Sequence, residues 1–205
     1  MHQYATDSYE KKFILLLIAI LSIIATWFVY ESIVILNSLT GLTPPWWLEI
    51  PSILTFYGVF YEIFDRWLWK KPVVHKLGLV RTPDLNGVWS GYVKSSHDEF
   101  KQEIEATLEV AQTWTHIEIH QKTKNSEGHS FAATIFTENI DAPRLVFMYR
   151  NAPAIDADPN MHQHLGSAQL VLSSDKKILS GDYYNCGRDR PTWGKLHFEK
   201  GSNIA

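Results

Sequence analysis

The sequence has a single cysteine, Cys186, and no run of like charges. One cysteine cannot form an intrachain disulfide or a cysteine-based metal site, which fits a reducing compartment for the soluble part of the chain. Its 19 Lys and Arg residues and 22 Asp and Glu residues give a net charge of −3. A surface for polymeric nucleic acid needs clustered cations that neutralise phosphates, so we expect no such partner.

Common catalytic and metal-binding motifs are also missing. The sequence contains no Gly-x-Ser-x-Gly, P-loop or Rossmann fingerprint. His116 and His120 would lie about 13 Å apart on a strand and could not share one ion. His162 and His164 would lie about 7 Å apart, but the sequence identifies no third ligand for them. We therefore expect no enzymatic activity, no metal and no cofactor, and we interpret Cys186 as incidental.

Charged residues are absent from Phe13–Tyr30, and the apolar run resumes after Glu31 through Leu36. A transmembrane helix needs about 20 apolar residues, so residues 13–36 are predicted to span a membrane. A secretory signal peptide would be shorter and would be followed by a small-residue cleavage site. The segment NSLTGLTPP that follows this run is not such a site.

A second apolar segment is shorter, because Glu49 and Pro51 limit its uncharged stretch to IPSILTFYGVFY. Tryptophans stand at both ends, at 46–47 and at 67 and 69, where amphipathic rings suit the headgroup level. We predict a second transmembrane helix over residues 46–64, so that residues 1–71 form a two-helix hairpin. The connector between the two segments has no Lys or Arg, whereas cations flank the pair on its other side: Lys11, Lys12, Arg66, Lys70, Lys71 and Lys76. By the positive-inside rule, both termini are expected to be cytoplasmic.

Glu31 is the ionisable residue that lies well inside an apolar run. At 1.5 Å per residue it lies about 27 Å along the helix from Phe13, near the far interface. Two interpretations stay open. Its carboxylate could reach headgroups or water, or it could make a polar contact between helices of neighbouring subunits and so support oligomerisation.

Beyond a linker at residues 72–83 the apolar residues recur with period two. Ile104, Ala106, Leu108 and Val110, for example, share one face of a strand. Eight such runs separated by turn signals predict an all-β soluble domain over residues 84–205. A closed antiparallel barrel of about eight strands would hide the strand edges and could hold one small ligand. Gly87-Val88-Trp89 is similar to the Gly-x-Trp start of lipocalin-type barrels, which implies that Trp89 plugs one end.

The stretch from Gly181 to Lys200 concentrates groups that suit a nucleotide. Aromatic rings stack on bases, Asn reads a base edge, and Arg grips phosphate with paired N–H donors. With the end of an earlier strand, the candidate ligand-binding residues are Tyr149, Arg150, Tyr183, Tyr184, Asn185, Arg188 and Arg190. A solvated loop with tyrosines packed into the barrel wall is the alternative for this stretch.

The order of elements resembles a known family. Two N-terminal membrane helices are followed by a basic linker and then by a barrel, which opens with LNGVWSGYVKSS and closes with GDYYN and RPTWGKLHFEK. This order is similar to the two-transmembrane, β-strand-rich effectors of bacterial cyclic-oligonucleotide anti-phage signalling (CBASS). The resemblance implies that the barrel senses a cyclic dinucleotide made by a partner nucleotidyltransferase. It further implies oligomerisation, contact with membrane lipid, disruption of the bacterial inner membrane and death of the infected cell.

Two other functions fit the same domain order. A membrane-tethered, lipocalin-like carrier would bind an apolar molecule, as the Gly-x-Trp start and the many aromatic residues suggest. A structural protein-interaction module would have a filled barrel and no small ligand. The binding of a dinucleotide by arginines should weaken as salt rises, whereas lipid binding should not.

Overall fold

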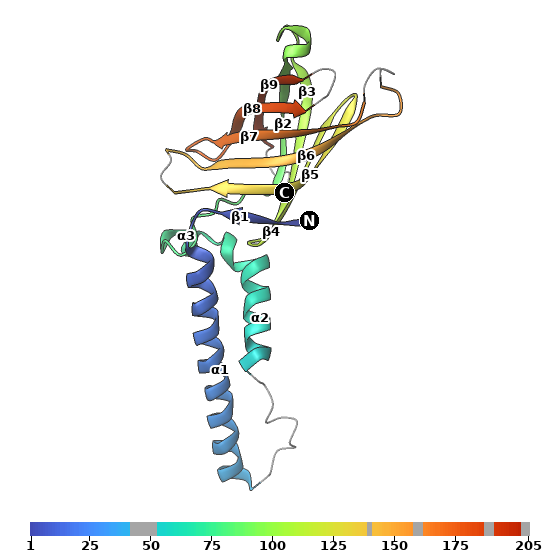
Figure 1. The fold of residues 1–205 in the computed structure, drawn as a ribbon. Coiled ribbons are helices and arrows are strands. Elements are labelled where there is room, and N and C mark those ends of the chain that lie inside the picture. The colour runs from blue at the N-terminus through green and yellow to red at the C-terminus, as the bar shows by residue number, and fades with distance from the viewer. Residues whose placement is uncertain (42–52, 139–140, 158–161, 187–190, 202–205) are drawn as a thin grey trace. The chain divides into compact units, whose positions relative to one another are not determined.

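The strand-rich part of the chain forms one sheet that closes into a barrel (Figure 1). The structure is a computed structural model and describes residues 1–41, 53–138, 141–157, 162–186 and 191–201. The described strands are β1 (His2–Thr6), β2 (Gly87–Ser95), β3 (Ile104–Gln112), β4 (His116–Thr123), β5 (Ser126–Phe136), β6 (Arg144–Pro153), β7 (His164–Leu172), β8 (Ile178–Cys186) and β9 (Thr192–Lys200). Around the barrel their order is β1-β4-β3-β2-β9-β8-β7-β6-β5.

The eight predicted runs correspond to β2–β9. These strands pair in antiparallel fashion in the order β4-β3-β2-β9-β8-β7-β6-β5. The expectation of eight strands was one short. β1 precedes the first helix and lies between β4 and β5, antiparallel to β4 and parallel to β5. β4 and β5 pair directly only beside their turn, from His120 with His129 to Lys122 with Glu127. Beyond those pairs β1 fills the space between them.

Side chains in β1 and just after it fix this strand in the barrel. Tyr4 is buried in the barrel core, and its hydroxyl donates to the backbone carbonyl of Trp114 at 2.7 Å. Asp7 accepts hydrogen bonds from the backbone N–H groups of Thr137 at 2.8 Å and Glu138 at 2.9 Å. The first residues of the chain are therefore part of the strand-rich unit.

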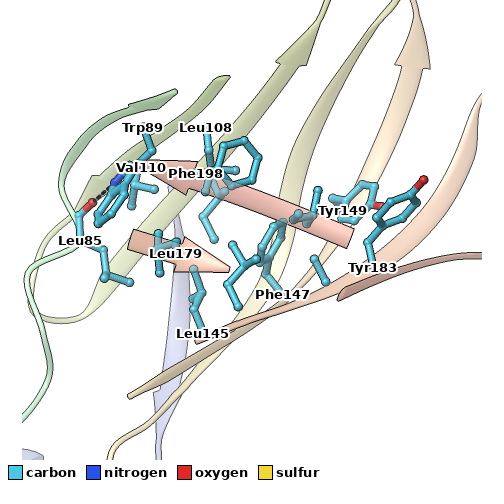
Figure 2. Close-up of a cluster of buried hydrophobic side chains, with 14 of the residues drawn as sticks. Leu85, Trp89, Leu108, Val110, Leu145, Phe147, Tyr149, Leu179, Tyr183 and Phe198 are labelled. Atoms are coloured by element: carbon cyan, nitrogen blue, oxygen red, sulfur yellow. Dashed lines mark hydrogen bonds between the residues drawn. The ribbon is translucent and has the colours of Figure 1, made fainter. Parts of the chain in front are cut away.

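One end of the barrel interior is filled with apolar side chains (Figure 2). Alternation along each strand sends every second residue inward. The inward residues that meet here include Trp89, Leu108, Leu145, Leu179 and Phe198, each 2% exposed or less. The indole N–H of Trp89 donates to the carbonyl of Leu85 at 2.9 Å, which satisfies the polar atom of this buried side chain. Trp89 thus has the structural role expected from the Gly-x-Trp pattern.

The chain divides into two compact units. The strand-rich unit contains residues 1–8 and the chain from Thr82 onward, and the helical unit is Tyr9–Arg81. This division differs from the expected bounds of 1–71 and 84–205, because β1 joins the barrel. The expected linker at 72–83 contains the short helix α3 (Pro72–Lys76), preceded by a 3₁₀ turn at Leu68–Lys70.

The helical unit contains α1 (Glu10–Thr40) and α2 (Ile53–Arg66), which pack against each other. Among the described residues, α1 is the one helix long and apolar enough to cross a membrane. Its 31 residues extend about 46 Å, more than the hydrocarbon thickness of about 30 Å. The expected second span over 46–64 falls partly on residues 42–52, which lie outside the described residues.

The buried residues of α1 follow one helical stripe: Glu10, Ile14, Ile18 and Ser22. Ser22 donates to the carbonyl of Ile18 at 2.7 Å, so its buried hydroxyl is satisfied within the helix. Glu31 lies farther along α1 and is half-buried. Within the described part of the chain, its carboxylate forms no hydrogen bond or ion pair.

Candidate ligand-binding site

Strand alternation divides the predicted ligand-binding residues between two faces of the barrel. Tyr149 on β6 and Tyr183 on β8 point into the interior and are each 7% exposed. Asn185 shares the inward face of β8 and is half-buried. Tyr184 points outward and is 57% exposed, and Arg150 is likewise exposed on the outer face of β6. The structure thus brings three of the predicted residues together.

A chain of hydrogen bonds links the inward-facing residues. The hydroxyl of Tyr149 donates to Oδ1 of Asn185 at 2.8 Å. The amide nitrogen of Asn185 then donates to the hydroxyl of Thr192 at the start of β9, at 2.9 Å. Both functional groups of the Asn185 side chain are therefore fixed, the oxygen by a side chain of β6 and the nitrogen by a side chain of β9. This connection holds Tyr149 in one orientation within the barrel.

Two glycines provide the space that the tyrosines occupy. Gly166 on β7 lies between β6 and β8, and a Cβ there would be 2.5 Å from Cζ of Tyr149. Gly194 on β9 pairs with Tyr183, and a Cβ at Gly194 would collide with the ring of Tyr183. A side chain at either position would displace an aromatic ring.

The environment keeps both inward phenols protonated. Burial raises the pKa of Tyr149, and the neighbouring Tyr183 and Cys186 raise it further. Burial also raises the pKa of Tyr183, against the opposing effect of a hydrogen bond with Ser95 and with a smaller contribution from Asp98. Neutral phenols supply an aromatic face and a hydroxyl that can donate to an acceptor. In Figure 2 the two tyrosines lie at one end of the apolar cluster.

Polar side chains occupy the inward positions beyond the tyrosines, at the ends of several strands. They are Ser95, Gln121, Thr123, Ser126, Asn151 and His164. The amide nitrogen of Asn151 lies 3.4 Å from Nε2 of His164. Oε1 of Gln121 is buried and has no hydrogen-bond partner among the described residues. We call this end of the barrel, from Tyr149 and Tyr183 outward, the polar end.

The sequence interpretation missed these polar inward residues. Ser95, Gln121 and Asn151, for example, each stand two positions beyond a buried residue of their own strand. Extending the period-two pattern to the strand ends would therefore have found them. Arg188 and Arg190, which were predicted to grip phosphate, lie outside the described residues. Asn185 and Thr192, which lie on either side of this segment, are hydrogen-bonded to each other at the polar end.

Comparison with known proteins identifies both parts of the chain. Residues 80–200 match the family model described as Cap15, cyclic dinucleotide receptor domain. Residues 12–70 match the model described as Cap15, TM helices. CD-NTase-associated protein 15 of Yersinia aleksiciae is 31% identical over 150 residues, which cover 71% of this chain and 69% of that protein. The chain therefore belongs to the Cap15 family of CBASS membrane effectors, with a cyclic dinucleotide receptor domain joined to a transmembrane region.

Proposed function

We propose that the cyclic dinucleotide binds at the polar end of the barrel and that binding triggers self-association and disruption of the inner membrane. The observation that carries the binding site is the inward group of Tyr149, Tyr183 and Asn185. It combines two neutral aromatic faces with an amide, which suit the stacking and edge recognition of bases. Binding can promote assembly only if the assembled form has the higher affinity for the ligand.

The phosphates of the ligand need cations, and we assign these to Arg188 and Arg190. Their segment joins β8 to β9, directly after Asn185 and before Thr192. Paired guanidinium donors give charge-assisted hydrogen bonds to phosphate. Arg150 is exposed on the outer face, so in our proposal it and Tyr184 do not contact a ligand inside the barrel.

The connectivity supports two membrane crossings with both termini in the cytoplasm. Residues 1–8 and the chain from Thr82 belong to one folded unit, so they lie on the same side of the membrane. If α1 crosses the bilayer, the chain must cross again between Thr40 and Thr82. Lys11 and Lys12 precede the first crossing, and Lys70 and Lys71 follow α2, so all four cations stand at the ends that continue into the barrel. The positive-inside rule makes this side of the membrane cytoplasmic.

In this proposal the chain acts as a receptor and effector, not as an enzyme, and damage comes from the membrane helices. Large apolar side chains cover the exposed part of α1 beyond Ser22: Ile23, Ile24, Trp27, Phe28, Val34, Ile35, Leu36 and Leu39. Glu31 interrupts this apolar surface. We propose that Glu31 makes a polar contact between neighbouring subunits, because hydrogen bonds associate helices in lipid. Membrane tethering helps by raising the effective concentration of the barrels.

The alternatives make different demands on the barrel interior. A lipocalin-like carrier needs an apolar cavity, but packed side chains from Trp89 to Phe147 fill the apolar end of the described interior. A protein-interaction module would bind no small molecule. Neither alternative accounts for the polar side chains of the polar end.

Matched substitutions of Tyr183 and Tyr184 test the proposed site, because these neighbours face opposite sides of β8. Binding of a panel of cyclic dinucleotides to the full-length protein in detergent would be measured by calorimetry. Tyr183→Ala should weaken binding by about 1 to 3 kcal/mol, the contribution of one stacked base. Tyr184→Ala should bind as the parent does. Equal binding by both variants would refute the interior site.

The same assay tests the arginines. Arg188→Ala and Arg190→Ala should each weaken binding by about 1.5 to 3 kcal/mol, the contribution of a charge-assisted hydrogen bond. Affinity of the parent should fall as salt rises, and less steeply in each variant. Arg150→Ala is the control, since its side chain lies on the outer face. Parent-like affinity and salt dependence in both variants would exclude this segment from phosphate binding.

A further inference from the structure

Two histidines and a glutamate meet on the outer face of the β4–β5 hairpin, outside the proposed dinucleotide site. His120 and His129 are directly opposite in the register, and their rings stack with centroids 4.0 Å apart. Glu127 lies two residues before His129 on the same face of β5. One ligand atom from each of His120, Glu127 and His129 lies within 4.8 Å of the others.

We propose that His120, Glu127 and His129 bind a Zn²⁺ ion. Neutral imidazole nitrogens and a carboxylate oxygen are ordinary zinc ligands, with bonds of about 2.0 to 2.2 Å, and three of them leave one position for water. Ligand atoms around such an ion lie about 3 to 4 Å apart, close to the spacing found here. The two stacked rings must turn toward a common point to bind, because the lone pair of an imidazole nitrogen lies in the plane of its ring. The sequence could not show this site, because its ligands come from two strands.

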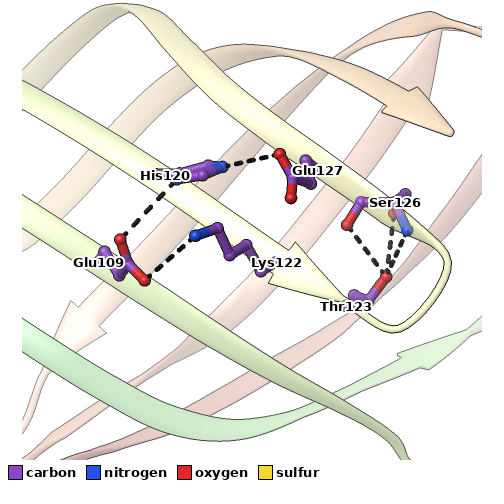
Figure 3. A network of polar contacts seen from close by, with 6 residues as sticks. All are labelled: Glu109, His120, Lys122, Thr123, Ser126 and Glu127. Atoms are coloured by element: carbon purple, nitrogen blue, oxygen red, sulfur yellow. Dashed lines mark hydrogen bonds and ion pairs between the residues drawn. The ribbon is translucent and has the colours of Figure 1, made fainter. Parts of the chain in front are cut away.

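The atoms of His120 are arranged as a metal-binding histidine requires. Its Nε2 is buried, has no hydrogen-bond partner among the described residues, and lies 3.6 Å from Oε2 of Glu127. Its Nδ1 lies 3.8 Å from Oε2 of Glu109 on the neighbouring strand β3 (Figure 3). Metal-bound histidines commonly donate their second ring N–H to a carboxylate, which fixes the tautomer and the ring orientation. Glu109 is therefore a positioning residue.

Charge in the cluster is also compatible with zinc. Lys122, the cation drawn in Figure 3, lies 3.5 Å from Glu109, so its charge is directed to that carboxylate. Burial lowers the pKa of His120, and His129 and Lys122 lower it further, against opposing effects of Glu127 and Glu109. A lowered pKa favours the neutral imidazole, which is the form that binds a metal ion.

The inner face of the same hairpin connects this site to the barrel interior. Gly128, between Glu127 and His129, faces inward, and a Cβ there would lie 3.5 Å from Cδ2 of Tyr149. Gln121, next to His120, also faces inward. A bound ion would fix β4 against β5 from outside and would raise the stability of the barrel, since it binds the folded state.

Zinc binding by the full-length protein in detergent tests this proposal without any dinucleotide. The protein would be stripped with a chelator and titrated with ZnCl₂, with a chromophoric competitor to measure affinity. We expect one ion per chain and a higher melting temperature with zinc. His120→Gln or His129→Gln should weaken zinc binding at least about 100-fold, and Glu109→Gln about 10- to 100-fold, as expected for a carboxylate that positions a ligand.

His197→Gln is the matched control. His197 is an outward-facing histidine on β9 that lies 3.6 Å from Glu199 but belongs to no such group of three ligands among the described residues. This variant should bind zinc as the parent does, and melting curves without metal should show that every variant is folded. Equal zinc affinity in the parent, His120→Gln and His129→Gln, or no binding by the parent at micromolar zinc, would overturn the proposal.

Discussion

Tyr149 and Asn185 are hydrogen-bonded at 2.8 Å across an intervening strand, with Gly166 of β7 between them. A Cβ at Gly166 would lie 2.6 Å from both the Tyr149 hydroxyl and Oδ1 of Asn185. The bond therefore depends on the absence of a side chain at Gly166. Three adjacent strands are thus adapted to one tyrosine–asparagine contact at the polar end.

The first prediction is that Gly166→Ala disrupts this contact. Introducing one methyl group into a tightly packed site should destabilise the barrel by about 1 to 3 kcal/mol. Cyclic dinucleotide binding should weaken as well, because the Tyr149 ring must move. Gly128→Ala is the control, since its new Cβ would make ordinary contacts at 3.5 Å. Chemical denaturation and calorimetry measure the two effects, and parent-like values for Gly166→Ala would contradict the close approach of Tyr149 and Asn185 to Gly166.

The second prediction concerns alkaline pH. Burial raises the pKa of Tyr149 above 10.0, with further contributions from Tyr183 and Cys186. Above about pH 10 the unfolded chain releases this proton while the folded chain retains it, so stability falls as pH rises. Melting temperatures from about pH 8 to about pH 11 should therefore fall less steeply in Tyr149→Phe than in the parent. Tyr184→Phe, altered on the outer face, should reproduce the parent's profile.

Adjacent tyrosines show how much of the site the sequence could predict. The period-two pattern that identified β8 also requires Tyr183 and Tyr184 to face opposite sides, so their division was available from sequence. The Tyr149–Asn185 bond could not be predicted from the sequence, because it depends on the register of three strands and on Gly166.

The fold was more accessible, since the eight later strands could be predicted from their alternation. β1 could not be predicted, because its five residues carry little pattern and pair with β5 far along the chain.

The third prediction tests β1 as part of the barrel. Tyr4 is 4% exposed, and its hydroxyl donates to the carbonyl of Trp114. Tyr4→Ala should destabilise the barrel by about 3 to 5 kcal/mol, the usual cost of truncating a large buried aromatic side chain. Gln3→Ala, at an exposed position of the same strand, should have little effect. A barrel equally stable with Ala at position 4 would mean that β1 contributes no packing.

The last prediction separates sensing from membrane damage and distinguishes the two interpretations of Glu31. Glu31→Gln keeps a hydrogen-bonding group, whereas Glu31→Leu removes both the charge and the hydrogen bond. If Glu31 joins neighbouring subunits, Glu31→Leu should abolish toxicity in cells that make the dinucleotide, and Glu31→Gln should largely retain it. Ligand binding by the barrel should be unchanged in both. Ser32→Ala is the matched control, because Ser32 already donates to the carbonyl of Phe28 within α1. Full toxicity of Glu31→Leu, measured by cell survival after ligand synthesis is induced, would instead favour a carboxylate that only reaches headgroups or water.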